Sequence, residues 1–170
     1  MTQLEASTAV VIDTNCVLDL WVFQDPGASG LLRDIVTTRW RWHASAAMRD
    51  ELRRVLAYPL ITARLEATRQ TAEQILALFD THALIEDAAP APCPVRCRDA
   101  DDQMFIDLAA QRRAVLVSKD GHVLELARRL TAYGVQVRRP WSEEATSAQA
   151  AHRKSRPALA GRRLGACGRP

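Results

Sequence analysis

The stretch Ala9-Val10-Val11-Ile12-Asp13-Thr14-Asn15 decides the fold. Its four consecutive apolar residues are typical of a central strand in a parallel sheet, which is covered on both faces. An acid that directly follows a buried apolar run is costly to place there unless it has a function. We therefore predict a parallel sheet with Asp13 at the carboxyl end of its first central strand.

A second apolar run, residues 114–117, is followed closely by Asp120. Between and around the two runs, apolar residues recur at helical spacing or in short strand-like groups. The pattern predicts helices over 17–22, 29–38, 45–56, 60–66, 71–81, 102–112 and 122–133, and short strands over 40–43, 83–85 and 135–137. Strands that alternate with helices imply right-handed crossovers. We predict a three-layer α/β/α sandwich with a central, mainly parallel sheet.

The chain of 170 residues has the size of one domain, with a composition typical of soluble globular proteins. We expect an N-terminal tail over 1–8, one folded domain over 9–142, and a disordered tail over 143–170, where periodicity is absent. From residue 151 onward there are six basic residues and no acid, so residues 1–150 carry 17 basic and 20 acidic residues, a net charge of −3. The basic tail suggests a polyanion partner or a solubilising terminus.

Membrane and secreted classes are disfavoured by the sequence. No run of eighteen apolar residues is present, and the first residues lack a basic segment followed by an apolar one. Cys93 and Cys97 have a loosely zinc-like spacing without a second ligand pair, so reduced cysteines fit better. We expect a cytoplasmic protein.

Four acids are expected to share one edge of the sheet. Asp13 and Asp120 each follow a strand, and Asp102 lies in the first turn of the helix that leads into the second strand. Glu51 lies about two turns into its helix and can reach the same cleft from the side. Carboxylates that converge repel one another, and oxygen ligands suit magnesium or manganese. A hard-metal site for phosphoryl chemistry follows from this arrangement.

At these residues the sequence resembles the PIN-domain family of metal-dependent nucleases. Four segments carry the resemblance, in the right order over residues 9–140: Val10-Val-Ile-Asp13-Thr-Asn15, Ser45 with Glu51-Leu-Arg-Arg-Val-Leu, Asp99-Ala-Asp-Asp102-Gln-Met-Phe-Ile, and Leu116-Val-Ser118-Lys-Asp120. The Asp-x-Asp-Asp form is most similar to a branch described as toxin components of bacterial toxin–antitoxin pairs. Lys119 departs from that branch, which often has glycine there.

The resemblance implies a Mg²⁺- or Mn²⁺-dependent ribonuclease. It implies that Asp13, Asp102 and Asp120 bind the metal and that Glu51 completes the site or positions the attacking water. Asn15, Ser118 and Asp99 are expected to contact substrate or to support these acids. The expected partners are RNA, a cognate antitoxin and a second copy of the chain.

Other interpretations of the same residues stay open at this point. Asp13 is also compatible with a turn, Asn15 with a helix cap, and Glu51 with a solvated pair involving Arg54. Asp107 is expected to point elsewhere, because it is turned about 140° from Asp102 on its helix. The tryptophans fit either base stacking or core packing. A non-catalytic RNA-binding module and an aspartyl-nucleophile phosphatase are the other function classes, but a phosphatase would need an acid where Asn15 stands.

Overall fold

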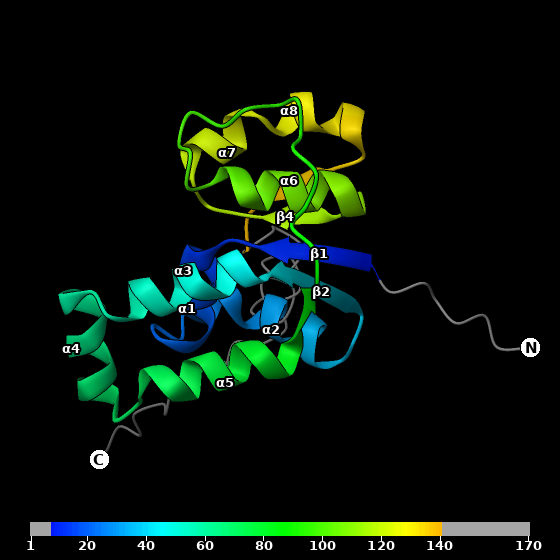
Figure 1. Ribbon diagram of the computed structural model, residues 1–170. Helices are drawn as coiled ribbons and strands as arrows, with labels where there is room; N and C mark the ends of the chain where they lie inside the picture. Colours follow the sequence, from blue (N-terminus) through cyan, green and yellow to red (C-terminus); the bar gives the residue numbers. More distant parts are fainter. Residues whose placement is uncertain (1–7, 141–170) are drawn as a thin grey trace, which may run out of the picture.

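A computed structural model describes residues 8–140 (Figure 1). Within these residues the chain forms one five-stranded sheet. The strands are β1 (Thr8–Ile12), β2 (Trp40–Ser45), β3 (Ala83–Glu86), β4 (Val115–Val117) and β5 (Gln136–Arg138). Their order is β3-β2-β1-β4-β5, and every neighbouring pair is parallel. The strand order reverses between β1 and β4, where the chain leaves β1 toward one side of the sheet and later returns to the other.

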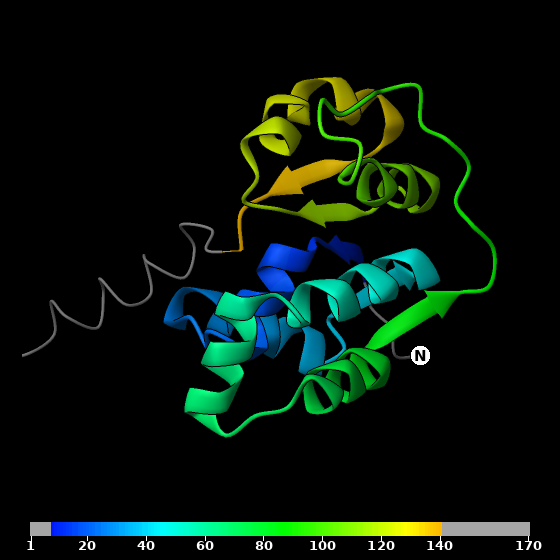
Figure 2. The ribbon, with the colours of Figure 1, turned by 60° about the vertical axis from the view of Figure 1, so that its left-hand side comes forward.

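Helices cover both faces of the sheet. The first layer holds α1 (Thr14–Trp21), α2 (Ser29–Val36), α3 (Ala46–Leu56), α4 (Pro59–Thr68) and α5 (Ala72–His82). The second layer holds α6 (Gln103–Arg112), α7 (Gly121–Glu125) and α8 (Ala127–Leu130), and Figure 2 shows the chain between β3 and α6 crossing from one layer to the other. Short 3₁₀ turns occur at Pro26–Ala28 and Thr131–Tyr133. This is the predicted α/β/α sandwich.

Several predicted element boundaries were wrong. The first helix begins at Thr14 rather than at residue 17, because the Asp13 side chain already caps it. The single helix expected over 122–133 is instead α7, α8 and a 3₁₀ turn. The 3₁₀ turn that closes this segment ends at Gly134, whose left-handed φ of 77° suits glycine. Ser45 caps α3 by accepting a hydrogen bond from the Met48 amide.

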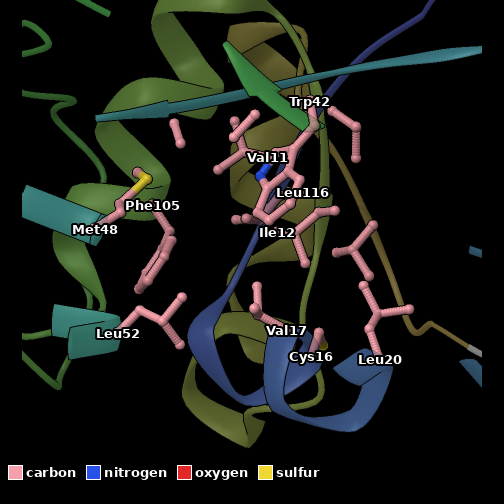
Figure 3. Packing of buried hydrophobic residues seen from close by; sticks show 14 of the residues in the cluster. Val11, Ile12, Cys16, Val17, Leu20, Trp42, Met48, Leu52, Phe105 and Leu116 are labelled. Carbon is pink, nitrogen blue, oxygen red and sulfur yellow. The ribbon is translucent and has the colours of Figure 1, made fainter. Parts of the chain in front are cut away.

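The core lies on both faces of the central strands (Figure 3). Phe105 of α6 lies close to Met48 and Leu52 of α3, where the two helix layers meet. Within the first layer's side of the sheet, the Trp42 ring lies 4.8 Å from the Phe79 ring and 5.7 Å from the Trp21 ring, measured between centroids. Trp21 and Trp42 are thus buried core residues, so core packing is the correct interpretation for these two.

Side chains of α6 hold the long connection between β3 and α6. Gln103 accepts a hydrogen bond from the Cys97 amide and donates to the Val95 carbonyl and to Oδ1 of Asp107. Asp107 also accepts from the Cys93 amide. Asp107 therefore points away from the predicted metal site, as expected, and helps to anchor the segment that leads to Asp102.

Within residues 8–140, no helix is long and apolar enough to cross a bilayer. The predicted N-terminal tail is described only at its last residue, Thr8, which belongs to β1. The predicted basic C-terminal tail lies outside the described residues.

Candidate functional site

Asp13 ends β1 and begins α1. Its Oδ1 atom accepts a hydrogen bond of 2.8 Å from the Cys16 amide, which caps the helix. Its Oδ2 atom is buried, and no donor among the described residues meets it with hydrogen-bond geometry. Burial raises the pKa of Asp13, while the nearby Ser118 hydroxyl and Lys119 amide and the bonded Cys16 amide oppose that rise. Oδ1 thus caps α1, whereas Oδ2 is a buried acceptor without a donor in the described part of the chain, which is energetically unfavourable.

Asp120 lies beside Asp13, at the carboxyl end of the neighbouring strand. The Asp13 amide donates to the Val117 carbonyl over 3.0 Å, which continues the β1–β4 ladder to the sheet edge. Ser118 is fully buried, and its Oγ accepts a 3.0 Å hydrogen bond from the Asp120 amide. Asp120 in turn caps α7 by accepting from the His122 amide at 2.7 Å. The two strand-end acids thus share the edge where the strand order reverses, a common ligand position in such sheets.

Glu51 reaches this edge from α3. Leu52 and Met48 face the core, so the adjacent position on the helix turns Glu51 toward the start of α1. There its Oε2 atom accepts a 2.8 Å hydrogen bond from the Thr14 hydroxyl. Burial raises the pKa of Glu51, and the Thr14 hydroxyl and the charge of Arg54 oppose the rise. Glu51 is therefore held toward Thr14, and the solvated pair that the sequence left open does not describe it.

Asp102 is the N-cap residue of α6, but its side chain makes no capping hydrogen bond. Burial raises its pKa to about 7, and the charges of Asp120, Asp99, Asp13 and Glu51 add to the rise. The charges of the other three predicted acids thus act on Asp102 at this end of the sheet. Their shared role as ligands of one metal remains a prediction.

The structure places Ser118, Asn15 and Asp99, which were expected to contact substrate or support the acids, in different surroundings. Ser118 is part of the edge, as described. Asn15 is exposed in the first turn of α1 and does not cap it, since that role belongs to Asp13. Asp99 is exposed and its Oδ1 atom accepts from the Asp101 amide, which shapes the turn before α6. A substrate contact by Asn15 or Asp99 remains a prediction.

Two features of the site were missed in the sequence. The first is the hydrogen bond of Thr14 to Glu51, which nothing in the sequence around Thr14 indicates. The second is the ion pair between Asp19 and Lys119, whose charged atoms lie 2.6 Å apart. The sequence did offer an indication of Asp19, because it is the one acid in the otherwise apolar segment 16–22.

The donor chemistry of this edge fits a hard divalent cation. Carboxylate oxygens are what Mg²⁺ and Mn²⁺ prefer, and the unpaired Oδ2 atom of Asp13 is a buried acceptor without a donor. Among residues 8–140, however, no three His, Cys, Asp or Glu side chains are already gathered as a ready metal cage. Asp102, Asp120 and Glu51 are partly exposed, so their side chains have room to change rotamer.

A cleft of about 470 Å³ opens beside Glu51. It is lined by Ala47, Asp50, Glu51, Arg54, Ala100, Asp101 and Met104. Of the four predicted acids, only Glu51 lines this cleft. A second pocket of about 410 Å³, between α1, α2 and α5, holds none of the predicted site residues.

Comparison with known proteins agrees with this geometry. The family model of the PIN domain matches residues 9–128, which include β1, α3, α6 and β4 with all four acids. No curated protein is similar enough to this chain to count as a match. The matched segment covers more than half of the chain, and PIN domains are generally nucleases. The chain therefore belongs to the PIN-domain family.

Proposed function

We propose that this protein is a Mg²⁺- or Mn²⁺-dependent ribonuclease that hydrolyses phosphodiester bonds in RNA. The observation that carries the proposal is the buried, unpaired Oδ2 atom of Asp13 within a group of four acids. Crowded carboxylates raise one another's pKa values, and a divalent cation is the group that offsets such repulsion. A phosphatase with an aspartyl nucleophile is less compatible, because Asn15 stands where its second acid would be.

The roles of the residues follow from their positions. Asp13, Asp102 and Asp120 would hold the cation, which supplies Lewis-acid polarisation of the phosphate and a more acidic water. Glu51, oriented by Thr14, would complete the site or accept a proton from the attacking water. Asp13 and Asp120 are well suited to fixed positions, since each also caps a helix through its Oδ1 atom.

RNA requires positive charge near this acidic edge. The exposed guanidinium of Arg54 lies 3.9 Å from Asp101 at the rim of the cleft. Exposed Arg138 is the last residue of β5, and its carbonyl accepts a hydrogen bond from the Ser118 amide. Charges on one copy alone leave the body net negative, so we propose a homodimer that combines basic side chains of both copies along one groove.

The resemblance of the third segment to the toxin branch supports a finer proposal. In it, the protein is the toxin of a cytoplasmic toxin–antitoxin pair. Its antitoxin would block the groove by placing an Arg or Lys near Asp13 and Asp102, where a cation would otherwise lie. Growth arrest on expression that disappears with Asp13→Asn is the expected sign, and arrest that persists in this variant would show that toxicity is not nucleolytic.

Cleavage of single-stranded RNA tests the proposed activity. Purified protein should cleave with Mg²⁺ or Mn²⁺, stop in excess chelator and recover when metal is restored. Glu51→Gln should remove cleavage, whereas Asp50→Asn, its exposed neighbour paired with Arg53, should retain it. Cleavage that continues unchanged in chelator would overturn the metal mechanism.

A further inference from the structure

Asp19 is a buried acid in the middle of the otherwise apolar helix α1. Only 5% of it is exposed, and its Oδ2 atom lies 2.6 Å from Nζ of Lys119, a residue 100 positions away. The Lys119 side chain is 33% exposed, so this pair reaches from the interior to the surface. A buried carboxylate without a partner is strongly unfavourable, so Lys119 is needed where Asp19 is present.

The direction of Lys119 follows from the alternation of side chains along a strand. Val117 pairs with Ile12, and the ladder continues for one more residue, with the Ser118 amide bonded to the Arg138 carbonyl. Ser118 and Lys119 therefore turn to opposite faces, and the contact with Asp19 places the Lys119 side chain against α1. The ammonium of Lys119 is thus fixed on α1 by Asp19.

The ion pair between Asp19 and Lys119 links the two chain segments that carry the predicted metal ligands Asp13 and Asp120. Asp13 begins α1, and Asp19 follows six residues later on the same helix. Lys119 is joined to Asp120 by a single peptide bond. Backbone hydrogen bonding ties β1 to β4 from one side, and the ion pair ties α1 to the turn after β4 from the other.

We propose that Asp19 and Lys119 are positioning residues that hold the turn from Ser118 to Asp120 against α1 and so fix the Asp120 carboxylate relative to Asp13. Their role in the reaction rests on the proposed metal-dependent nuclease function. An ion pair kept only for stability would have little advantage, since apolar replacements of such pairs are often neutral or stabilising. The ion pair lies next to Asp13 and Asp120 along the chain, so positioning these acids gives it a role that stability alone does not.

The decisive variant is Asp19→Asn combined with Lys119→Met, because it removes both charges and leaves no buried carboxylate unpaired. Mn²⁺ affinity of the full chain, measured by calorimetry, should fall about 10- to 100-fold, as when a metal ligand loses its supporting partner. The double variant should lose no more than Asp19→Asn alone, since the pair acts as one unit. Lys119→Arg should keep affinity near that of the unchanged protein. Asp50→Asn with Arg53→Met removes an exposed pair and serves as the matched control.

Amide hydrogen exchange of the metal-free protein supplies a second measurement that does not depend on catalysis. The Asp120 and His122 amides are hydrogen-bonded within the turn, and both should exchange faster in the double variant than in the control. Unchanged Mn²⁺ affinity in a folded double variant would reduce the pair to a structural contact. If the unchanged protein itself bound no Mn²⁺ and cleaved no RNA, the proposed function would fail. In that case unchanged exchange at Asp120 and His122 would overturn the positioning role separately.

Discussion

Thr14 donates its hydroxyl hydrogen to Oε2 of Glu51 over 2.8 Å, which joins the first residue of α1 to the middle of α3. The bond holds Glu51 toward the acidic edge and favours its carboxylate form, against the burial that raises its pKa. The residue directly after Asp13 therefore orients the acid proposed to act on water.

Replacement of Thr14 by Val should raise the pKa of Glu51 further, because the carboxylate loses a hydrogen-bond donor while its burial remains. If ionised Glu51 accepts a proton, the acidic limb of the pH–rate profile should move up by roughly one pH unit. Thr14→Ser keeps the hydroxyl and should leave the limb in place. If the Thr14→Val and Thr14→Ser variants had the same pH–rate profile, the hydrogen bond from residue 14 would not control the pKa of Glu51.

Asp13→Asn and Asp13→Ala should separate the two oxygens of Asp13. Asn also caps helices well, so Asp13→Asn should remove cleavage while the metal-free protein becomes more stable at neutral pH, since a buried charge is gone. Asp13→Ala should also remove cleavage but be about 1 kcal/mol less stable than the Asn variant, because the cap of α1 is lost. Urea unfolding measures the difference, and equal stabilities would contradict the capping role.

Asp102 predicts how the stability of the metal-free protein depends on pH. Its pKa rises from 3.8 to about 7 in the folded state, so the folded state binds more protons between these values. The unfolding free energy contributed by Asp102 is therefore fully present below about pH 4 and is lost as pH rises through about 7. The full shift corresponds to roughly 4 kcal/mol, and solvent screening of this partly exposed side chain reduces the expected effect to about 2 kcal/mol.

Asp102→Asn should accordingly be more stable than the unchanged protein at pH 8 and similar to it at pH 4. Unfolding in chelator-treated buffer at both pH values measures this, with Asp101→Asn as the exposed neighbouring control. If Asp102→Asn were stabilised equally at both pH values, the titration of Asp102 would not be the cause of the gain.

The sheet was predictable because its central strands are short apolar runs that end in acids. Asp13 and Asp120 mark the edge directly, since strand ends of a parallel sheet meet there. The break of the last helix into α7 and α8 was not predictable, because apolar spacing continues through residues 122–133 while the backbone does not. The bond of Thr14 to Glu51 and the pair of Asp19 with Lys119 join residues 37 and 100 positions apart, and one sequence carries no record of such contacts.

The basic tail gives a prediction from charge alone. Truncation after residue 150 removes six positive charges, so RNA affinity should fall and its dependence on salt should weaken, by roughly 0.7 in logarithmic slope for each lost phosphate contact. Anisotropy titrations over a salt series, made in an Asp13→Asn background to prevent cleavage, measure both quantities. Identical slopes for the full and truncated chains would mean that the tail does not contact RNA.

The most direct test of the account is the initial rate of single-stranded RNA cleavage in Mn²⁺ by Asp102→Asn, beside Asp99→Asn and Asp101→Asn. Asp102 is the acid whose pKa responds to all the others, so its loss should reduce the rate by more than about 100-fold, beyond the effect of losing a supporting residue. Asp101→Asn should cleave at the unchanged rate. Full activity of Asp102→Asn together with an inactive Asp99→Asn would contradict the assigned site.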